Sequence, residues 1–285
     1  MANPLYDNLI GEHATNDACF LRQPGKPAVS FRQFSERTSQ VANLLLKHGL
    51  KPGDRVAVQA SKTVEMVILY GATIQAGGIF LSLNTDYKKD EISYFIKDAS
   101  PKIFVCDPQK RKDLEDIADQ VGSQVLTLDK DGQGSLQSQA NILSKTFNTI
   151  DRRPDDLVAL LYTSGTTGRS KGAMLTQNNL LSNAKTLKNL WEVNEDDILI
   201  HALPIFHTHG LFVALNTALL AGAEVTFLQK FEITEIIEAI RASTLLMGVP
   251  TFYTRLLADE RLTAHLAKNM SCLLYTSELP TISDV

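Results

Sequence analysis

One stretch near the middle of the 285-residue chain, residues 160–172, constrains the fold and the chemistry more than any other. It begins with apolar and aromatic residues, as a buried strand does, and then consists almost entirely of hydroxyl-bearing residues, glycines and cations. Glycines permit positive φ angles, so consecutive backbone N–H groups can converge on a concave nest that binds an anion. The stretch therefore predicts a strand followed by an anion-binding loop.

The residue types in this loop suit the phosphates of a nucleotide, and we expect ATP as the ligand. Lys171 supplies a compact positive charge at the far end of the loop, where the outer phosphates would lie, and Arg169 supplies a second one. Hydroxyl groups and backbone amides would surround the phosphate oxygens. The residues expected to do so are Thr163, Ser164, Gly165, Thr166, Thr167 and Gly168.

Two better-known motifs do not fit this loop. A Walker-type P-loop has glycine directly before its lysine and Ser or Thr directly after it, whereas Ser170 precedes Lys171 and Gly172 follows it. Residues 173–176 have the pattern of a short strand, so the loop is expected to connect two strands. A serine-hydrolase elbow needs a glycine two residues before its serine, which Ser164 lacks. An ordinary polar hairpin turn is the remaining alternative.

Length, charge and cysteine content limit the classes of partner. A chain of 285 residues with 44% hydrophobic residues can fill one large domain or two closely packed subdomains. Its net charge of -4 gives no electrostatic reason to expect nucleic acid or an anionic membrane as a partner. No signal-peptide pattern and no run of about 18 apolar residues is present, so we expect a soluble, cytoplasmic protein. The three cysteines, Cys19, Cys106 and Cys272, suggest neither a disulfide framework nor a zinc site.

Apolar periodicity predicts strands that alternate with helices along most of the chain. This order is typical of an α/β fold with mostly parallel sheets flanked by helices. Residues 129–138, rich in Gly, Gln and Ser, are expected to form an exposed and inessential loop, and residues 1–30 a helix and a loop. Strands are predicted at 55–59, 79–83, 103–106, 125–128, 198–202, 225–228 and 245–248, and helices at 31–48, 63–76, 89–98, 111–121, 178–191, 211–220, 233–242 and from Pro250 onward.

A second motif, Leu-Pro-Ile-Phe-His-Thr-His-Gly at residues 203–210, follows one of the predicted strands. Open α/β sheets bind ligands beyond the carboxyl ends of their strands, so this loop is a candidate binding site. His207 and His209 would suit a metal ion, but no third ligand of suitable spacing is evident, and His201 fits the strand instead. A purely structural loop with hydrogen-bonded histidines is the alternative.

These motifs closely resemble those of a known superfamily. The sequence Tyr-Thr-Ser-Gly-Thr-Thr-Gly-x-x-Lys-Gly from Tyr162 is similar to the phosphate loop of the adenylate-forming enzymes, which include acyl-CoA synthetases, luciferases and the adenylation domains of peptide synthetases. Pro204, Phe206, His207 and Gly210 match a second motif of that superfamily, Pro-x-Phe-His-x-x-Gly. The resemblance implies that this chain forms the two α/β subdomains of the superfamily's large N-terminal domain.

The resemblance also implies a reaction. A carboxylate attacks the α-phosphate of ATP, pyrophosphate leaves with Mg²⁺, and the acyl-adenylate is captured by the thiol of coenzyme A. Lys171 and His207 would then be the catalytic residues of this chain, with His207 beside the reacting carboxylate. Thr163 or Thr167 would contact the ATP-bound Mg²⁺, and no other metal ligand is assigned.

A third stretch, Met-Gly-Val-Pro-Thr-Phe-Tyr-Thr-Arg at residues 247–255, indicates the substrate. In most acyl-CoA synthetases the similar Gly-Val-Pro segment begins a helix that lines the acyl pocket. A cation such as Arg255 near that pocket would disfavour a fatty acid but would suit a second carboxylate. With the histidine motif, this stretch resembles the malonyl-CoA synthetases, and the likeness runs from about residue 79 to residue 263.

That resemblance implies that Arg255, with Thr208 and His209, binds the distal carboxylate of malonate, since Arg–carboxylate contacts give both charge complementarity and length discrimination. Three alternatives remain. Arg255 could be a solvated helix residue, the chain could belong to a general acyl- or aryl-CoA ligase, or it could be a non-catalytic nucleotide-binding fragment. We expect residues 1–270 to be a partial N-terminal AMP-binding domain and residues 271–285 an atypical tail, with the superfamily's C-terminal domain absent. The chain alone is then expected to adenylate malonate very poorly.

Overall fold

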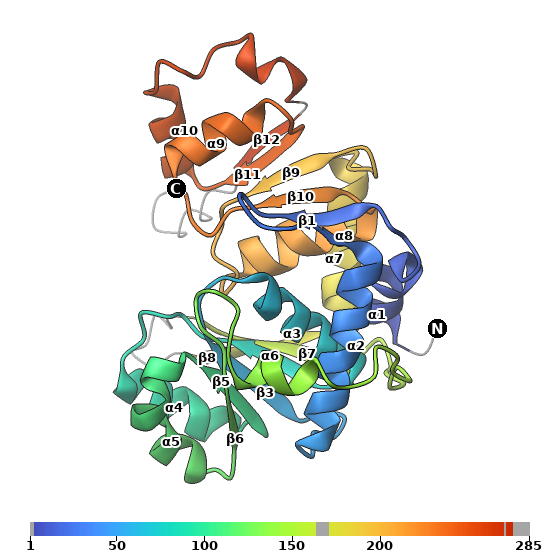
Figure 1. Cartoon of the computed structure of the whole chain (residues 1–285), viewed down its shortest axis with the longest axis vertical. Helices are drawn as coiled ribbons and strands as arrows, with labels where there is room; N and C mark the ends of the chain where they lie inside the picture. The colour runs from blue at the N-terminus through green and yellow to red at the C-terminus, as the bar shows by residue number, and fades with distance from the viewer. Residues whose placement is uncertain (1–2, 164–170, 271, 276–285) are drawn as a thin grey trace, which may run out of the picture.

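A computed structural model describes residues 3–163, 171–270 and 272–275. The described strands form two six-stranded sheets, which build the two lobes of an elongated molecule (Figure 1). Helices flank both sheets, as the alternating pattern predicts. No helix within these residues has the length and apolar character needed to cross a membrane.

The first sheet is mostly parallel and carries the predicted anion-binding loop at one edge. All of its described neighbouring strands are parallel except β7 and β8, which form an antiparallel hairpin. The strand order is β6 (Gln124–Thr127), β5 (Ile103–Cys106), β3 (Arg55–Gln59), β4 (Ile79–Ser82), β7 (Leu157–Thr163) and β8 (Lys171–Thr176).

The second sheet has the same character. Its described strands are parallel except for the antiparallel pair β1 and β2. The strand order is β12 (Cys272–Tyr275), β11 (Leu245–Gly248), β9 (Ile198–His201), β10 (Glu224–Phe227), β1 (Cys19–Arg22) and β2 (Val29–Ser30).

The helices and strands lie close to their predicted positions. Each predicted strand is present with both ends within one residue, except that the strand predicted at 173–176 begins two residues earlier, and most helices agree within two residues. One predicted helix, at 211–220, is divided into a π-helix and an α-helix. The helices are α1 (Pro4–Leu9), α2 (Phe31–Lys47), α3 (Val64–Gln75), α4 (Lys89–Ala99), α5 (Arg111–Asp119), α6 (Ser135–Ala140), α7 (Gln177–Leu190), the π-helix η3 (His209–Leu215), α8 (Asn216–Ala221), α9 (Ile233–Ile240) and α10 (Pro250–Leu257), with short 3₁₀ turns η1 (Gly11–His13), η2 (Pro108–Lys110) and η4 (Leu266–Asn269).

One hydrophobic core joins the two sheets. It contains Val56 and Val58 of β3 together with Leu199 of β9 and Val225 of β10. Helix α3 contributes to this core and is apolar all round, and only Glu65 of its residues is not buried. Because α3 is buried on nearly every side, it holds the residues directly before it in a fixed position. These residues form part of the candidate functional site.

Two expectations for the loops are wrong. Residues 129–138 are not an inessential loop, because α6 begins within them and Leu136 is fully buried in the common core. Residues 1–30 contain not only α1 but also β1 and β2, and β1 pairs with β10 about 200 residues later in the chain. Such long-range pairing leaves no periodic signal in a four-residue strand.

Candidate functional site

The predicted anion-binding loop connects two strands, as expected. β7 and β8 are antiparallel, and Thr163 faces Lys171 across the pair. This pairing holds the two ends of the loop side by side. Lys171, the first residue of β8, is exposed. The other predicted phosphate ligands lie outside the described residues: Ser164, Gly165, Thr166, Thr167 and Gly168, with Arg169, Ser170 and the side chain of Thr163.

The loop end of this hairpin is anchored to α4. The hydroxyl of Tyr162 donates a hydrogen bond to the carboxylate of Asp98, and the Tyr162 ring lies 4.5 Å from that of Phe95, centroid to centroid. Burial, and then the bond to Asp98, raises the pKa of Tyr162, so its hydroxyl stays protonated and remains a donor. The strand that leads into the predicted phosphate loop is thereby fixed against the rest of the first sheet.

The second motif forms a loop with a tightly closed neck, which we call the histidine loop (residues 202–210). It leaves β9 after His201 and enters η3 at His209. A Cβ placed on Gly210 would overlap the carbonyl oxygen of Pro204, so the two ends of the loop approach more closely than any other residue at 210 would allow. This close approach explains the glycine of the motif in physical terms.

His201 lies in strand β9, as expected, and is fully buried. Its Nδ1 is 2.8 Å from Nζ of Lys62, and its Nε2 is 2.8 Å from the carbonyl oxygen of Gly210. Burial lowers the pKa of His201 well below its usual value, and the neighbouring Lys62 lowers it further. The imidazole is therefore neutral, and it pins the neck of the histidine loop.

The remaining histidines lie at the outer part of this loop. His207 and Thr208 are exposed, and His209 is half-buried. The ring of His207 is 4.4 Å from that of Phe206, centroid to centroid. Partial burial lowers the pKa of both His207 and His209, so both imidazoles are neutral at pH 7 and each keeps one nitrogen as a hydrogen-bond acceptor.

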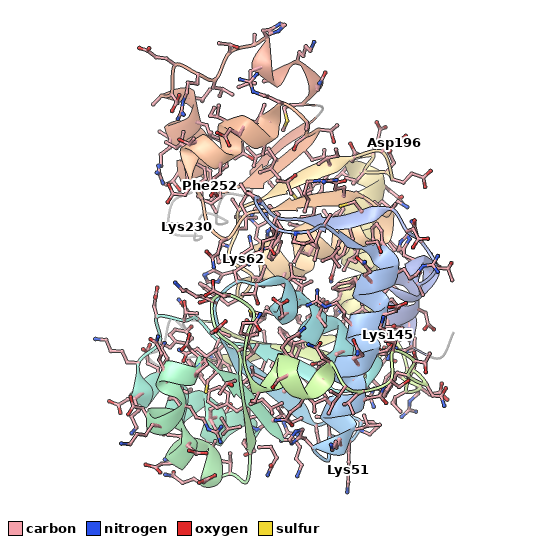
Figure 2. All side chains as sticks on the ribbon, in the orientation of Figure 1. Lys51, Lys62, Lys145, Asp196, Lys230 and Phe252 are labelled. Carbon is pink, nitrogen blue, oxygen red and sulfur yellow. The ribbon has the colours of Figure 1, made fainter. Side chains whose placement is uncertain are left out.

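A cavity of about 450 Å³ lies beside the histidine loop, between the two lobes. Figure 2 shows Lys62, Lys230 and Phe252, which line it, close together at the boundary between the lobes, whereas Lys51 lies at the far end of the first lobe and Asp196 on the side of the second. Residues that follow the carboxyl ends of β3, β9 and β10 form its wall: Ala60, Ser61 and Lys62; Pro204, Ile205 and Phe206; and Gln229, Lys230 and Phe231. The cavity therefore occupies the edge at which parallel sheets bind ligands.

Arg255 lies next to this cavity without lining it. It is exposed on α10, and its guanidinium carbon is 4.6 Å from the centroid of the Phe231 ring, a cation–π contact. Phe231 in turn packs on Phe252, with the two centroids 4.1 Å apart, and both rings line the cavity. The structure places Arg255 one aromatic ring away from the cavity, and the contacts described for it do not include Thr208 or His209.

Two cavity residues, Lys62 and Lys230, were not identified from the sequence. Lys62 lies in the connection between β3 and α3. It directly precedes Thr63, whose side chain caps the first turn of α3. The rule that singled out the histidine loop, a polar residue beyond the carboxyl end of a predicted parallel strand, applies equally to Ser61 and Lys62. The sequence alone did not indicate that this lysine is buried, because lysines before helices are usually solvated.

Comparison with known proteins agrees with this geometry. Residues 12–279 match the protein family described as AMP-binding enzyme. The fold superposes on apo MatB from Rhodopseudomonas palustris with a TM-score of 0.95 and 48% identity, over 100% of this chain and 56% of that chain. ATP-bound MatB from the same organism gives 0.93 and 49% identity, over 96% of this chain and 54% of that chain.

Curated relatives point in the same direction. A malonate–CoA ligase of Arabidopsis thaliana is 27% identical over 270 residues, which are 85% of this chain and 44% of the relative. An oxalate–CoA ligase of the same plant is 33% identical over 190 residues, 65% of this chain and 37% of the relative. The chain thus spans about half, or less, of the length of these proteins. The sequence match, the α/β fold and the two motifs together show that the chain belongs to the family of AMP-binding enzymes.

Proposed function

We propose that this chain is part of an AMP-forming acid–thiol ligase that converts malonate to malonyl-CoA. A malonate oxygen attacks the α-phosphorus of ATP, the bond to pyrophosphate breaks, and malonyl-AMP forms. The sulfur of coenzyme A then attacks the acyl carbon, and AMP leaves. The similarity to MatB and to a malonate–CoA ligase supports this reaction.

The observation that carries the proposal is the charge of the cavity. Among the described residues that line it, two are lysines, Lys62 and Lys230, and none is acidic. Burial lowers the pKa of Lys62, and Lys230 forms an ion pair of 2.8 Å with Glu232. Arg255, behind the Phe231 ring, is in none of the ion pairs of the described residues. A lining without acidic residues and with Arg255 behind it favours a small dianion such as malonate, whereas a fatty acid would bring no second carboxylate to Arg255.

The roles of the individual residues follow from their positions. Lys171, at the mouth of the hairpin, would neutralise phosphate charge, with Thr163, Ser164, Gly165, Thr166, Thr167 and Gly168 around the phosphates. Neutral His207 would donate a hydrogen bond from its protonated ring nitrogen to an oxygen of the reacting carboxylate and so orient the attack on the α-phosphorus. Arg255, Thr208 and His209 would hold the distal carboxylate, which requires the Arg255 side chain to leave the face of Phe231. Mg²⁺ bound to ATP would contact Thr163 or Thr167 and would neutralise the leaving pyrophosphate.

Residues 1–270 would then be a partial N-terminal AMP-binding domain. Residues 271–285 would be an atypical tail. Strand β12 lies beyond residue 270 and pairs with β11, and the family match continues to residue 279.

A second candidate is an aryl-CoA ligase. Three phenylalanines line the cavity, Phe206, Phe231 and Phe252, and the last two are in ring contact. Such faces would pack well on an aromatic acid. The two candidates differ in whether the cations or the rings determine which acid is bound.

The test uses a chimera in which residues 1–270 are followed by the remaining part of R. palustris MatB. ATP–pyrophosphate exchange is measured with malonate, acetate, benzoate and a long-chain fatty acid. We expect exchange with malonate to exceed that with the other acids by about tenfold or more. Faster exchange with benzoate would favour the aryl-CoA ligase, and no exchange with any acid would favour a nucleotide-binding fragment. The added half is the same in every variant, so differences between variants of residues 1–270 report on this chain.

A further inference from the structure

Three residues connect the two lobes beneath the cavity. Nζ of Lys62, at the end of the connection from β3, lies 2.8 Å from Nδ1 and 2.9 Å from the backbone oxygen of His201. Nε2 of His201 lies 2.8 Å from the carbonyl oxygen of Gly210. A group from the first lobe is therefore linked through the imidazole to the neck of the histidine loop in the second.

The chemistry of these atoms fixes the protons. The oxygen of Gly210 can only accept, so Nε2 of His201 must carry its proton. The neutral ring then leaves Nδ1 as an acceptor, and Lys62 donates to it. Lys62 can donate to both Nδ1 and the His201 oxygen whether its own nitrogen is an ammonium or a neutral amine. Lys62 therefore favours the same tautomer of His201, with the proton on Nε2, that donates to the Gly210 oxygen.

The position of Lys62 has an energetic cost, so its hydrogen bonds must offset a desolvation penalty. Lys62 is buried, and burial lowers its pKa well below the usual value. No acidic side chain within the described residues forms an ion pair with it, and its nitrogen lies 4.5 Å from the centroid of the Phe227 ring. A methionine would fill the same space without the desolvation penalty.

The histidine loop depends on this link at its neck. Gly210 packs against the carbonyl of Pro204, and the amide of Leu211 donates to the oxygen of His207 over 3.1 Å. Pro204, Ile205 and Phe206 form one wall of the cavity. A change in the tautomer of His201 would turn an acceptor toward the Gly210 oxygen, so two acceptors would face each other and the neck would open.

We propose that Lys62 is a positioning residue for the histidine loop: it donates to Nδ1 of His201, fixes the Nε2–H tautomer, and so holds His207 and the cavity wall in place. The relevance of this positioning to catalysis rests on the proposed function. The arrangement of donors and acceptors can be tested without it.

The test uses the 285-residue chain with ¹⁵N-labelled histidine. We expect the NMR signals of His201 to show an unprotonated Nδ1 and a protonated Nε2. In Lys62→Met the signals should shift toward a protonated Nδ1, and the amides of residues 206–211 should exchange their hydrogens about tenfold faster, as expected when one hydrogen bond is lost. The matched control is Lys230→Met, which removes an exposed lysine of the same cavity and should change neither.

A second variant guards against simple misfolding. In His201→Gln the side-chain amide can donate to Gly210 without help from Lys62, so adding Lys62→Met to this variant should cause no further increase in exchange. Additive effects would overturn the proposal, as would a protonated Nδ1 in the unmodified chain or unchanged signals in Lys62→Met. A failure of the proposed function would appear in a different measurement, as the absence of pyrophosphate exchange in the chimera. That result would leave the tautomer of His201 unaffected.

Discussion

Three histidines within nine residues have different environments, and their burial decides what each can do. His201 is fully buried and bonded on both ring nitrogens, whereas His207 is exposed and His209 is half-buried. The sequence assigned His201 to a strand correctly, since the apolar pattern continues through it. It could not show that Lys62, 139 positions earlier, is the partner of that ring.

The burial of His201 predicts a pH-dependent stability. In the unfolded chain the pKa of His201 returns to about 6.5, whereas in the folded chain burial holds it well below that value. The unfolded state therefore binds a proton at higher pH than the folded state, so this contribution to stability is complete above pH 6.5 and is lost as the pH falls toward the lowered pKa. The thermal midpoint should fall between pH 7 and about pH 5, and it should fall less in His201→Gln.

The control is the same substitution at an exposed residue, His265→Gln, whose thermal midpoint is followed over the same pH range. Burial also lowers the pKa values of His13, His207 and His209, so part of the fall in the thermal midpoint should remain in His201→Gln. An identical fall in His201→Gln and the unmodified chain would show that His201 does not contribute.

Arg255 gives a prediction on substrate selection. Its guanidinium rests on Phe231, and none of the ion pairs of the described residues includes it, so it is available to a carboxylate. In the chimera, Arg255→Leu should raise the KM for malonate about 30-fold, which corresponds to a loss of ~2 kcal/mol, the lower range for truncating one partner of a charged hydrogen-bonded pair. Affinity for ATP should not change. Arg241→Leu, at an exposed arginine after α9, should leave both unchanged, and an unaltered KM in Arg255→Leu would refute the assignment.

Helices and strands with a clear apolar pattern were predicted from the sequence, whereas α6, β1 and β2 were not. Helix α2 has an apolar face and a Ser30–Gln33 capping box, and both its type and its ends were predicted correctly. Helix α6 has six residues with few apolar side chains, so composition favoured a loop. What stabilises α6 is tertiary: Ser135 and Thr127 exchange hydrogen bonds of 2.9 Å, and Leu136 enters the common core.

The burial of α6 leads to a prediction about stability. Leu136→Ala removes a fully buried side chain and should lower the free energy of unfolding by about 2–4 kcal/mol, measured by urea titration. Ile142, just beyond the same helix, is 81% exposed, and Ile142→Ala should change stability by less than about 0.5 kcal/mol. Equal effects of the two substitutions would contradict the assignment of α6 to the core.

The common core of the two sheets determines where the cavity forms. Tyr70 of α3 donates a hydrogen bond of 3.1 Å to Asn216 of α8, and both residues are fully buried. This contact and the shared core bring the carboxyl ends of strands from both sheets to one place. The sequence predicted each sheet and the two motifs, but the meeting of Lys62, Phe206 and Phe231 around one cavity depends on how the sheets pack, which periodicity does not encode.

The surface beside the predicted phosphate loop leads to a final prediction about activity. Strand β8 is the edge of its sheet, residues 171–174 are exposed, and Met174 is 66% exposed. Stabilisation of charge on a transferring phosphoryl group requires preorganised donors in a site from which water is excluded, and Lys171 here stands in solvent. The 285-residue chain should therefore form malonyl-AMP at well below ~1 per second, while the chimera, in which the rest of MatB is present, should be faster. Release of pyrophosphate is the measurement, and Lys171→Met in the chimera is the control for the phosphate loop. A rate of ~1 per second for the chain alone would show that the exposed hairpin is sufficient for adenylation and needs no further part of the protein to exclude water from it.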